Sequence, residues 1–424
     1  MIILSHSGKQ HSYHTALAMY KLGKLERFYT SSYVRSSFLQ KQIEKKPENI
    51  LSRRYIKGLP GSLVSANWRF EIPEMVLRKI HGKSASVQKY VYLRDTHFDQ
   101  YIANKIQKIN PEQSKNLNFW GFQGSCHDSL EAANKKGIKS ICELSTAHVV
   151  SARRILGEEA KLHPEWAGSI DNLVFPAEYE KRLVEEPHIA KRVVAASAFT
   201  RESLLEAGIE SEKIDVLPLG CDTEHIYYAE NPDDRIASRP LRLLFAGTVT
   251  QRKGIKYLLE AMRKIMPGKD IELHIIGGVQ GSDEALRNYK GLYNYHGAVS
   301  QQELFRTFRE YDALVLPTIF EGFGLVIVEA MAAGLPVITT PHSMGPEVIS
   351  EGKNGYIVPV RDIDVLANAI ISLREKTDEA FLDMRKSARQ AALGYSWEGY
   401  AERMKIILDQ EFKMQIANSK IQMF

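Results

Sequence analysis

The segment 313–340 constrains the fold more than any other part of the chain, because two apolar runs flank a loop and a helix there. The runs 313–317 and 336–340 are continuous rather than alternating, which is typical of strands buried on both faces of a parallel sheet. Between them, a glycine-broken loop leads into a helical pattern that Gly334 and Pro336 end. This order predicts a parallel α/β unit whose loop opens at the carboxyl edge of the sheet.

Two carboxylates occupy this unit eight residues apart, with Glu321 in the loop and Glu329 in the helix. Gly322 and Gly324 lack the Cβ atoms that would keep an oxygen-rich ligand away from backbone N–H groups. The helix N-terminus adds donors and the positive end of its dipole, which favour an anion. Glu329 points back toward the loop, and its carboxylate suits a pair of vicinal hydroxyls. For the two glutamates alone, an acidic helix start without a ligand is the competing interpretation.

Together with its flanking strands, this motif resembles that of the retaining GT-B glycosyltransferases of glycosyltransferase family 4. The resemblance implies that Glu321 lies against the donor sugar and that Glu329 holds the ribose hydroxyls. It also implies an α/β fold of two Rossmann-like, doubly wound domains that face each other across a cleft. Backbone contacts to the sugar and phosphates then fall to Gly322, Phe323, Gly324 and Leu325.

A second candidate element is a pair of cations, Arg252 and Lys253, on the loop that leaves the apolar run 241–247. A helix follows, with apolar residues at i, i+3, i+4 and i+7 starting from Ile255. Two cations on such a loop can neutralise a diphosphate leaving group without a metal ion. The family places its diphosphate-binding Arg-Lys-Gly run here, so the resemblance makes Arg252 and Lys253 catalytic candidates beside Glu321.

Three further positions are assigned to donor binding by the same resemblance. Gly247 and Thr248 end the strand before the basic pair. Many relatives carry an arginine directly after this glycine, so Thr248 is a departure that leaves more of the phosphate charge to Arg252. Apolar runs and helical patterns continue to alternate beyond this point, as in a parallel sheet with helices on both faces. Family members clamp the nucleobase with backbone near Val299, and such contacts do not disclose which base is preferred.

The amino-terminal half reads as a second sheet of the same kind, since 424 residues exceed what one core normally holds. It begins with a strand at 2–5 and a turn at 7–9. Relatives have a glycine-rich loop here that touches the diphosphate from across the cleft, and Gly8 remains of it. His148 follows a strand pattern at 139–144, where family members carry a cleft-lining histidine near the donor sugar and the acceptor.

The expected amino-terminal acceptor domain covers residues 1–222, and the expected carboxy-terminal donor domain covers 223–395. The break should fall within 222–240, because 230–234 is polar and turn-forming. A last helix at 396–415 carries an apolar stripe that needs a surface to cover it. In GT-B enzymes the final helix crosses back to the first domain, whereas the pattern by itself equally allows a core helix of the second domain.

Positive charge gathers in residues 21–89, which hold 15 Lys or Arg against 5 Glu, a net of +10, while the whole chain carries +5. Apolar and aromatic residues at 59–70 and a basic amphipathic pattern at 74–83 suit an anionic membrane or a phosphate-bearing lipid acceptor. A solvated face over core aromatics explains the same residues equally well. Nucleic acid is not expected as a partner, because the cations form no groove-reading stripe.

The expected location is the cytoplasm, with peripheral contact at the inner face of the membrane as an option. The sequence contains no run of eighteen apolar residues, so no membrane span is predicted. The spacing of Cys126, Cys142 and Cys221 argues against a disulfide framework and a zinc site. Asp362 and Asp364 have the Asp-x-Asp spacing that binds a divalent ion in another glycosyltransferase fold, but here they are better interpreted as a helix cap. No metal and no cofactor are expected besides the nucleoside diphosphate-sugar.

The sequence therefore predicts a retaining, metal-independent glycosyltransferase of the hexosyltransferase class. It would move a sugar from a nucleoside diphosphate-sugar to a hydroxyl of a glycan or lipid-linked acceptor, in polysaccharide or glycolipid synthesis. Three alternatives share the fold or the pocket: a sugar phosphorylase, a sugar-nucleotide epimerase and a non-catalytic nucleotide-sugar-binding protein. A nicotinamide-dependent oxidoreductase is disfavoured, because no strand is followed by a full Gly-x-Gly-x-x-Gly.

Overall fold

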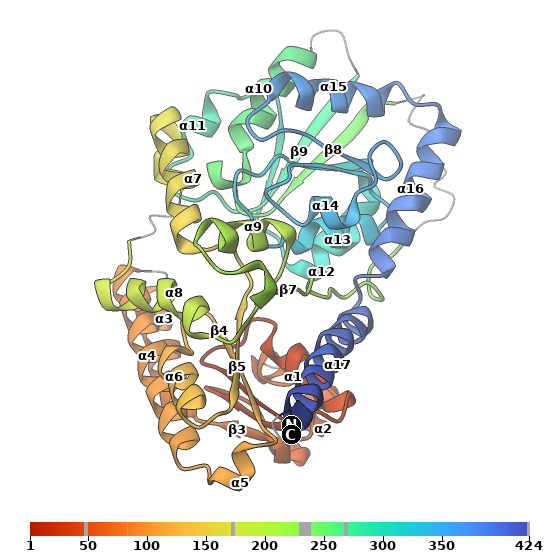
Figure 1. The fold of residues 1–424 in the computed structure, drawn as a ribbon. Helices are drawn as coiled ribbons and strands as arrows, with labels where there is room; N and C mark the ends of the chain where they lie inside the picture. The colour runs from red at the N-terminus through yellow and green to blue at the C-terminus, as the bar shows by residue number, and fades with distance from the viewer. Residues whose placement is uncertain (46–49, 83, 171–173, 229–238, 267–269, 422–424) are drawn as a thin grey trace.

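The computed structural model describes residues 1–45, 50–82, 84–170, 174–228, 239–266 and 270–421. They form two α/β domains, one above the other in Figure 1, and each is built on a single parallel sheet. This confirms the predicted pair of doubly wound domains. The predicted break at 230–234 lies outside the described residues, so the exact boundary stays a prediction. Among the described helices, none is both long enough and apolar enough to span a bilayer.

The amino-terminal sheet has seven strands in the order β3-β2-β1-β4-β5-β6-β7. Its central strands β1 and β4 are buried at every position, as expected for continuous apolar runs covered by helices on both faces. The strands are β1 (Ile2–His6), β2 (Leu25–Thr30), β3 (Val64–Ala66), β4 (Asn118–Phe122), β5 (Lys139–Leu144), β6 (Arg192–Ala195) and β7 (Ile214–Val216). The helices are α1 (Ser12–Lys21), α2 (Ser37–Lys45), α3 (Ile72–His81), α4 (Ala85–Gln107), α5 (Pro111–Ser114), α6 (His127–Lys135), α7 (Val149–Leu162), α8 (Ala177–Ile189) and α9 (Ala198–Glu206).

The carboxy-terminal sheet has six strands in the order β10-β9-β8-β11-β12-β13. The apolar face predicted for the helix after the basic pair is confirmed, because Ile255, Leu258, Leu259 and Met262 are all fully buried. The strands are β8 (Leu241–Ala246), β9 (Ile271–Ile276), β10 (Asn294–Gly297), β11 (Ala313–Leu316), β12 (Val337–Thr339) and β13 (Gly355–Ile357). The helices are α10 (Ile255–Ile265), α11 (Glu284–Arg287), α12 (Gln301–Thr307), α13 (Leu325–Ala332), α14 (Gly345–Val348), α15 (Ile363–Arg374) and α16 (Asp378–Leu393).

The last helix, α17 (Trp397–Ile421), packs on α1 of the amino-terminal domain, as Figure 1 shows. The indole of Trp397 stacks on the imidazole of His14 with ring centres 3.7 Å apart. The Tyr400 hydroxyl lies 3.0 Å from Thr15 Oγ1, and both residues are fully buried. Of the two interpretations of the apolar stripe, the structure shows the one in which the chain returns to its first domain. The domains are therefore connected twice.

Segments of the amino-terminal domain also reach across to the donor domain. Helix α7 lies alongside the carboxy-terminal domain in Figure 1, and the turn that follows it, η4 (Pro164–Ser169), contacts the turn η7 (Gln251–Lys253). Ser169 accepts the backbone N–H of Gln251 on its Oγ at 2.9 Å. The loop that carries the predicted basic pair is thus held from both domains.

Candidate active site

Glu321 lies on the loop between β11 and α13. Two backbone hydrogen bonds to the segment that follows β12 hold this loop in place. The backbone N–H of Glu321 donates to the carbonyl of His342 at 3.0 Å, and the carbonyl of Phe323 accepts from Met344 N–H at 3.0 Å. Gly324 then caps α13 with φ +84°, a conformation that residues with a Cβ rarely adopt. The loop delivers Glu321 directly in front of the helix N-terminus, as predicted.

The basic pair contacts Glu321, although Lys253 and Glu321 are 68 positions apart in the sequence. Lys253 Nζ lies 2.7 Å from Glu321 Oε2, and Arg252 approaches the same oxygen at 3.3 Å. Burial alone would raise the pKa of Glu321, but the charges of Lys253 and Arg252 outweigh it and hold this pKa below its usual value. The carboxylate is therefore ionised at neutral pH, and two cations share it at the start of a helix.

Glu329 lies one turn into α13 and is buried. Gln301, the first residue of α12, donates from its side-chain amide to Glu329 Oε1 at 2.9 Å. Burial raises the pKa of Glu329, and the hydrogen bond from Gln301 opposes this only in part. Gln301 thus orients the carboxylate that is predicted to hold the ribose. Its sequence signal is its place at the start of a helix directly after the predicted base-binding segment, where Val299 is half-buried.

Gly322 has no room for a side chain, but for a different reason from the one predicted. A Cβ here would lie 2.4 Å from the carbonyl oxygen of Ser145 and 2.6 Å from Thr146 Cα, both in the loop after β5. Ser197, at the N-terminus of α9, donates from its hydroxyl to the Gly322 carbonyl at 2.8 Å. This glycine therefore permits the close approach of the two domains, and the approach of a ligand to its backbone stays a prediction.

The remaining residues that were predicted to bind the donor differ in how exposed they are. Gly247 adopts φ +123°, and a Cβ on it would lie 3.2 Å from Lys253 Cε, so this glycine leaves space for the lysine. Thr248 and Leu325 are exposed, and Phe323 is buried. Gly8, on the opposite domain, is half-buried, and its N–H donates to His6 Nδ1 at 2.7 Å.

The structure does not bring His148 to the cleft surface, contrary to the prediction. The residue is fully buried directly before α7, where its Nδ1 accepts the N–H of Val150 at 3.4 Å. Burial lowers the pKa of its imidazole, and the nearby charge of His188 on α8 lowers it further. Its neighbours Ala147 and Val149 line the cavity instead. The ring therefore has a place in the packing of α7 against α8.

A cavity of about 250 Å³ lies between the amino-terminal domain and Phe320 of the donor domain, the residue that precedes Glu321 in the chain. Its floor contains Glu143, whose side chain is nearly fully buried. The two Glu143 oxygens lie 2.5 Å from His11 Nε2 and 2.7 Å from the Trp120 indole N–H. The lining combines aromatic rings with side-chain amides and contains no cation: Gln10, Gln88, Tyr92, Phe122, Gln123, Glu143, Ser145, Thr146, Ala147, Val149, Ala152, Phe175, Tyr179, Leu183 and Phe320.

Glu143 and His11 are candidate site residues that the sequence patterns did not select. Glu143 is a carboxylate between Cys142 and Leu144 near the end of the buried strand β5, and that position was its available signal. The contact to His11 joins residues 132 positions apart and depends on the order of strands in the sheet. Sequence patterns do not specify such a contact.

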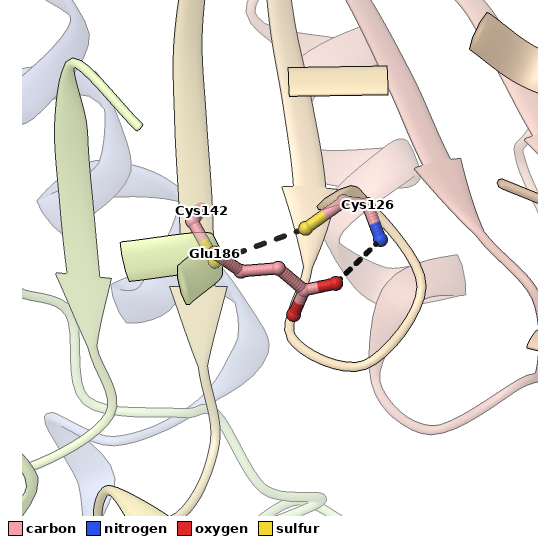
Figure 2. Close-up of side chains that lie close together, drawn as sticks. All are labelled: Cys126, Cys142 and Glu186. Carbon is pink, nitrogen blue, oxygen red and sulfur yellow. Dashed lines mark hydrogen bonds between the residues drawn. The ribbon is translucent and has the colours of Figure 1, made fainter. Parts of the chain in front are cut away.

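One group of three possible metal ligands lies together within the described residues: Cys126, Cys142 and Glu186. Figure 2 shows Glu186 reaching the backbone nitrogen of Cys126, with the two sulfurs 3.8 Å apart. The same carboxylate also accepts N–H groups of Gly124 and His127 at the N-terminus of α6. Burial raises the pKa of both thiols, which disfavours the thiolate that zinc prefers. We interpret the group as a helix cap.

The predicted role of Asp362 is confirmed, because its side chain accepts the Val365 N–H at 2.9 Å and caps α15. Asp364 forms an ion pair with Lys264 on α10 at 2.5 Å. The two aspartates thus have structural partners on the donor domain.

Two parallel α/β domains that meet over a glutamate, a basic pair and a helix N-terminus define the GT-B class of glycosyltransferases. Residues 240–376 match the family described as glycosyl transferases group 1. The amylovoran biosynthesis glycosyltransferase AmsK of Erwinia amylovora is 30% identical over 353 residues, which cover 76% of this chain and 83% of that protein. The chain therefore belongs to the group 1 glycosyltransferases.

Two further similarities concern part of the sequence and the fold. The D-inositol 3-phosphate glycosyltransferase of Paenarthrobacter aurescens (strain TC1) is 30% identical over 240 residues, or 52% of this chain, and the match spans just 57% of that protein. The solved structure of Anabaena HepE in complex with UDP-glucose superposes with a TM-score of 0.58 at 15% identity, covering 96% of this chain and 99% of that one. That similarity shows a shared fold.

Proposed function

We propose that this protein is a retaining hexosyltransferase that moves a sugar from a nucleoside diphosphate-sugar to a hydroxyl of a glycan or lipid-linked acceptor, without a metal ion. One observation carries the proposal. Lys253 and Arg252 converge on Glu321 before the N-terminus of α13, and the preceding residue, Phe320, lines the cavity. Two cations and a helix dipole are what a departing nucleoside diphosphate requires in a site from which water is excluded.

The donor would occupy the side of the site that the carboxy-terminal domain supplies. Glu329, oriented by Gln301, accepts hydrogen bonds from two ribose hydroxyls, while Lys253 and Arg252 meet the diphosphate. The solved structure of HepE, which shares the fold, is a complex with UDP-glucose. This supports a nucleotide-sugar as the class of donor. With the diphosphate bound, the two cations are divided between its oxygens and Glu321, and the carboxylate orients the sugar.

The proposed reaction retains the configuration of the anomeric carbon. The bond from this carbon to the diphosphate oxygen breaks, and a bond to the acceptor oxygen forms on the same face of the sugar. The acceptor proton passes to the departing phosphate oxygen, so neither a covalent intermediate nor a metal is needed. Arg252 and Lys253 stabilise the negative charge that develops on the leaving group.

The cavity supplies the acceptor side of the proposal. Aromatic rings such as Tyr92, Phe122 and Tyr179 offer apolar faces to a sugar ring, and amides such as Gln10 and Gln123 can bond its hydroxyls. This lining supports an uncharged saccharide at the acceptor position, in the synthesis of a polysaccharide or glycolipid. The cytoplasm is the proposed location.

The test combines nucleotide binding with turnover. Thermal-shift titrations with UDP, GDP and ADP should give a rise in Tm for one base that EDTA does not change. Glu321→Ala should abolish sugar transfer and leave affinity for this nucleotide within about threefold, whereas Glu329→Ala and Lys253→Ala should each weaken affinity at least tenfold, about 1.4 kcal/mol. Equal losses in all three variants would contradict the division of roles. Turnover that needs inorganic phosphate, or that changes the donor without an acceptor, would reveal a phosphorylase or an epimerase.

A further inference from the structure

Helix α3 presents its apolar side to solvent and its carboxylate to the protein. Ile72, Met75, Val76 and Ile80 recur at helical spacing, and their exposed fractions are 53%, 41%, 50% and 67%. Glu74, by contrast, is buried and forms ion pairs with Arg78 and with Arg94 of α4. This arrangement reverses the usual orientation of a surface helix, in which the apolar side faces the core. A contiguous exposed apolar face of this kind marks an interaction surface.

The charge around this face is positive. Helix α3 carries Arg78, Lys79 and His81 near its end, all exposed, while its one carboxylate, Glu74, is turned inward. The helix belongs to the segment 21–89, whose net charge is +10. An anionic partner with an apolar interior would satisfy both properties of the surface.

The neighbouring apolar residues at 59–70 are buried in part, and Trp68 among them is half-buried. Leu59, Val64 and Phe70 are buried in the cores of the amino-terminal domain, so they are not available to a partner. The predicted basic amphipathic helix at 74–83 corresponds to α3, whose apolar side is exposed. Within 59–82, the large apolar side chains that are exposed lie on α3, and elsewhere in the segment 21–89 helix α2 also exposes Phe38 and Leu39.

We infer that the exposed face of α3 docks this protein on an anionic lipid bilayer. Four apolar side chains on a short helix can enter the region between headgroups and acyl chains, while the cations at the helix end meet lipid phosphates. A second copy of the chain is a poorer occupant, because a two-fold contact through α3 would bring together two surfaces of the same positive charge.

The docked helix lies close to the proposed acceptor cavity. Helix α3 packs against α4, and α4 contributes Gln88 and Tyr92 to the cavity lining. A lipid-linked saccharide would then reach the cavity from the same membrane that holds the protein. This consequence for the acceptor rests on the proposed function, whereas docking itself does not.

Flotation of the full chain with vesicles tests the inference. The wild type should float with vesicles of phosphatidylglycerol and phosphatidylcholine and at least tenfold less with phosphatidylcholine alone. The double variant Val76→Asp/Ile80→Asp should lose at least tenfold in binding to the anionic vesicles, and Lys79→Glu should lose binding and much of its salt dependence. Ile406→Asp is the matched control, because Ile406 is 59% exposed on α17 and should float like the wild type.

The opposite results would overturn docking. No flotation of the wild type, or equal flotation of the double variant with an unchanged Tm, would exclude a role of α3 at a membrane. A dimer in analytical ultracentrifugation that Ile80→Asp dissociates, without vesicle binding, would assign the face to a second copy. The nucleotide-induced rise in Tm should be the same in the double variant and the wild type, so failure of docking is distinguishable from failure of the proposed function.

Discussion

Replacing Glu159 by glutamine tests whether the amino-terminal domain holds the phosphate loop of the donor domain. Glu159 of α7 is fully buried, and its carboxylate accepts three hydrogen bonds from the other domain. Gln251 Nε2 donates at 2.7 Å, the Tyr257 hydroxyl at 2.8 Å and Arg361 Nε at 2.7 Å. Gln251 directly precedes the Arg252-Lys253 pair, so this contact and the phosphate loop belong to one turn.

The expected loss of stability in Glu159→Gln follows from how deeply the charges of Glu159 and Arg361 are buried. Breaking a fully buried ion pair costs about 3–5 kcal/mol, and an amide in place of the carboxylate turns one acceptor into a donor. The Arg361 side chain keeps 29% of its surface exposed, so water screens it and the loss in Glu159→Gln should be about 2–3 kcal/mol. For a domain of this size, that loss corresponds to a fall in Tm of about 4–10 °C. The KM for the donor should also rise several-fold, because the loop loses its anchor.

Differential scanning calorimetry and donor saturation kinetics measure the two effects. The matched control is Glu158→Gln on the same helix, whose side chain is 48% exposed and lies 3.6 Å from Arg361. It should change stability by no more than about 0.5 kcal/mol. A Glu159→Gln protein with the stability and the donor KM of the wild type would refute the reasoning. A lower Tm with an unchanged donor KM would show that Glu159 stabilises the domain contact but does not position the phosphate loop.

Two further perturbations address a titrating group and a domain contact. The carboxylates of Asp128 and Glu185 raise the pKa of His127 to about 9, so this stabilisation should be complete below pH ~6.5 and lost as the pH rises through 9. His127→Gln should remove about 1–2 kcal/mol of the stability lost over this pH range and so flatten the fall in Tm, and an unchanged pH profile would contradict the assignment. Gly322→Ala should lower both Tm and turnover, because its Cβ would meet a backbone oxygen of the other domain at 2.4 Å. Gly157→Ala within α7 is the control, since nothing lies within 4 Å of its Cβ and helix propensity predicts a gain of up to about 1 kcal/mol; an equal loss in both variants would contradict the clash.

The sequence determined the local architecture, because that architecture depends on periodicity and on short spacings. Continuous apolar runs predicted the buried strands β8 and β11, and helical spacing predicted the buried face of α10. The glycine-broken loop with Glu321, the helix with Glu329 and the cap formed by Asp362 were all predictable from neighbouring residues. Each of these features lies within one or two helical turns of the residues that specify it.

The chemical environment of the site was decided by tertiary structure. The pairing of Lys253 with Glu321 joins positions 68 residues apart, and the pairing of Gln301 with Glu329 joins positions 28 residues apart. His148 shows where sequence patterns mislead. Its place after a strand predicted a position in the cleft, but the packing of α7 against α8 buries it. Periodicity indicates that a residue faces inward, but it does not indicate which neighbour it meets.

The same division explains why two amphipathic helices, α3 and α17, differ in exposure. Amphipathic patterns predicted α3 and α17 equally well, yet α17 buries its apolar stripe on α1 whereas α3 exposes its apolar side. A pattern specifies that a helix has an apolar side; the surfaces that the rest of the chain leaves available decide whether that side is covered. The sequence by itself thus determined strands and helices with a clear periodicity, such as β8, β11 and α10, and the family motif. Only the assembled domains determined the cavity, the contact at Glu159 and the exposure of α3, because each of these requires side chains from distant segments to pack, or to leave a face unpacked.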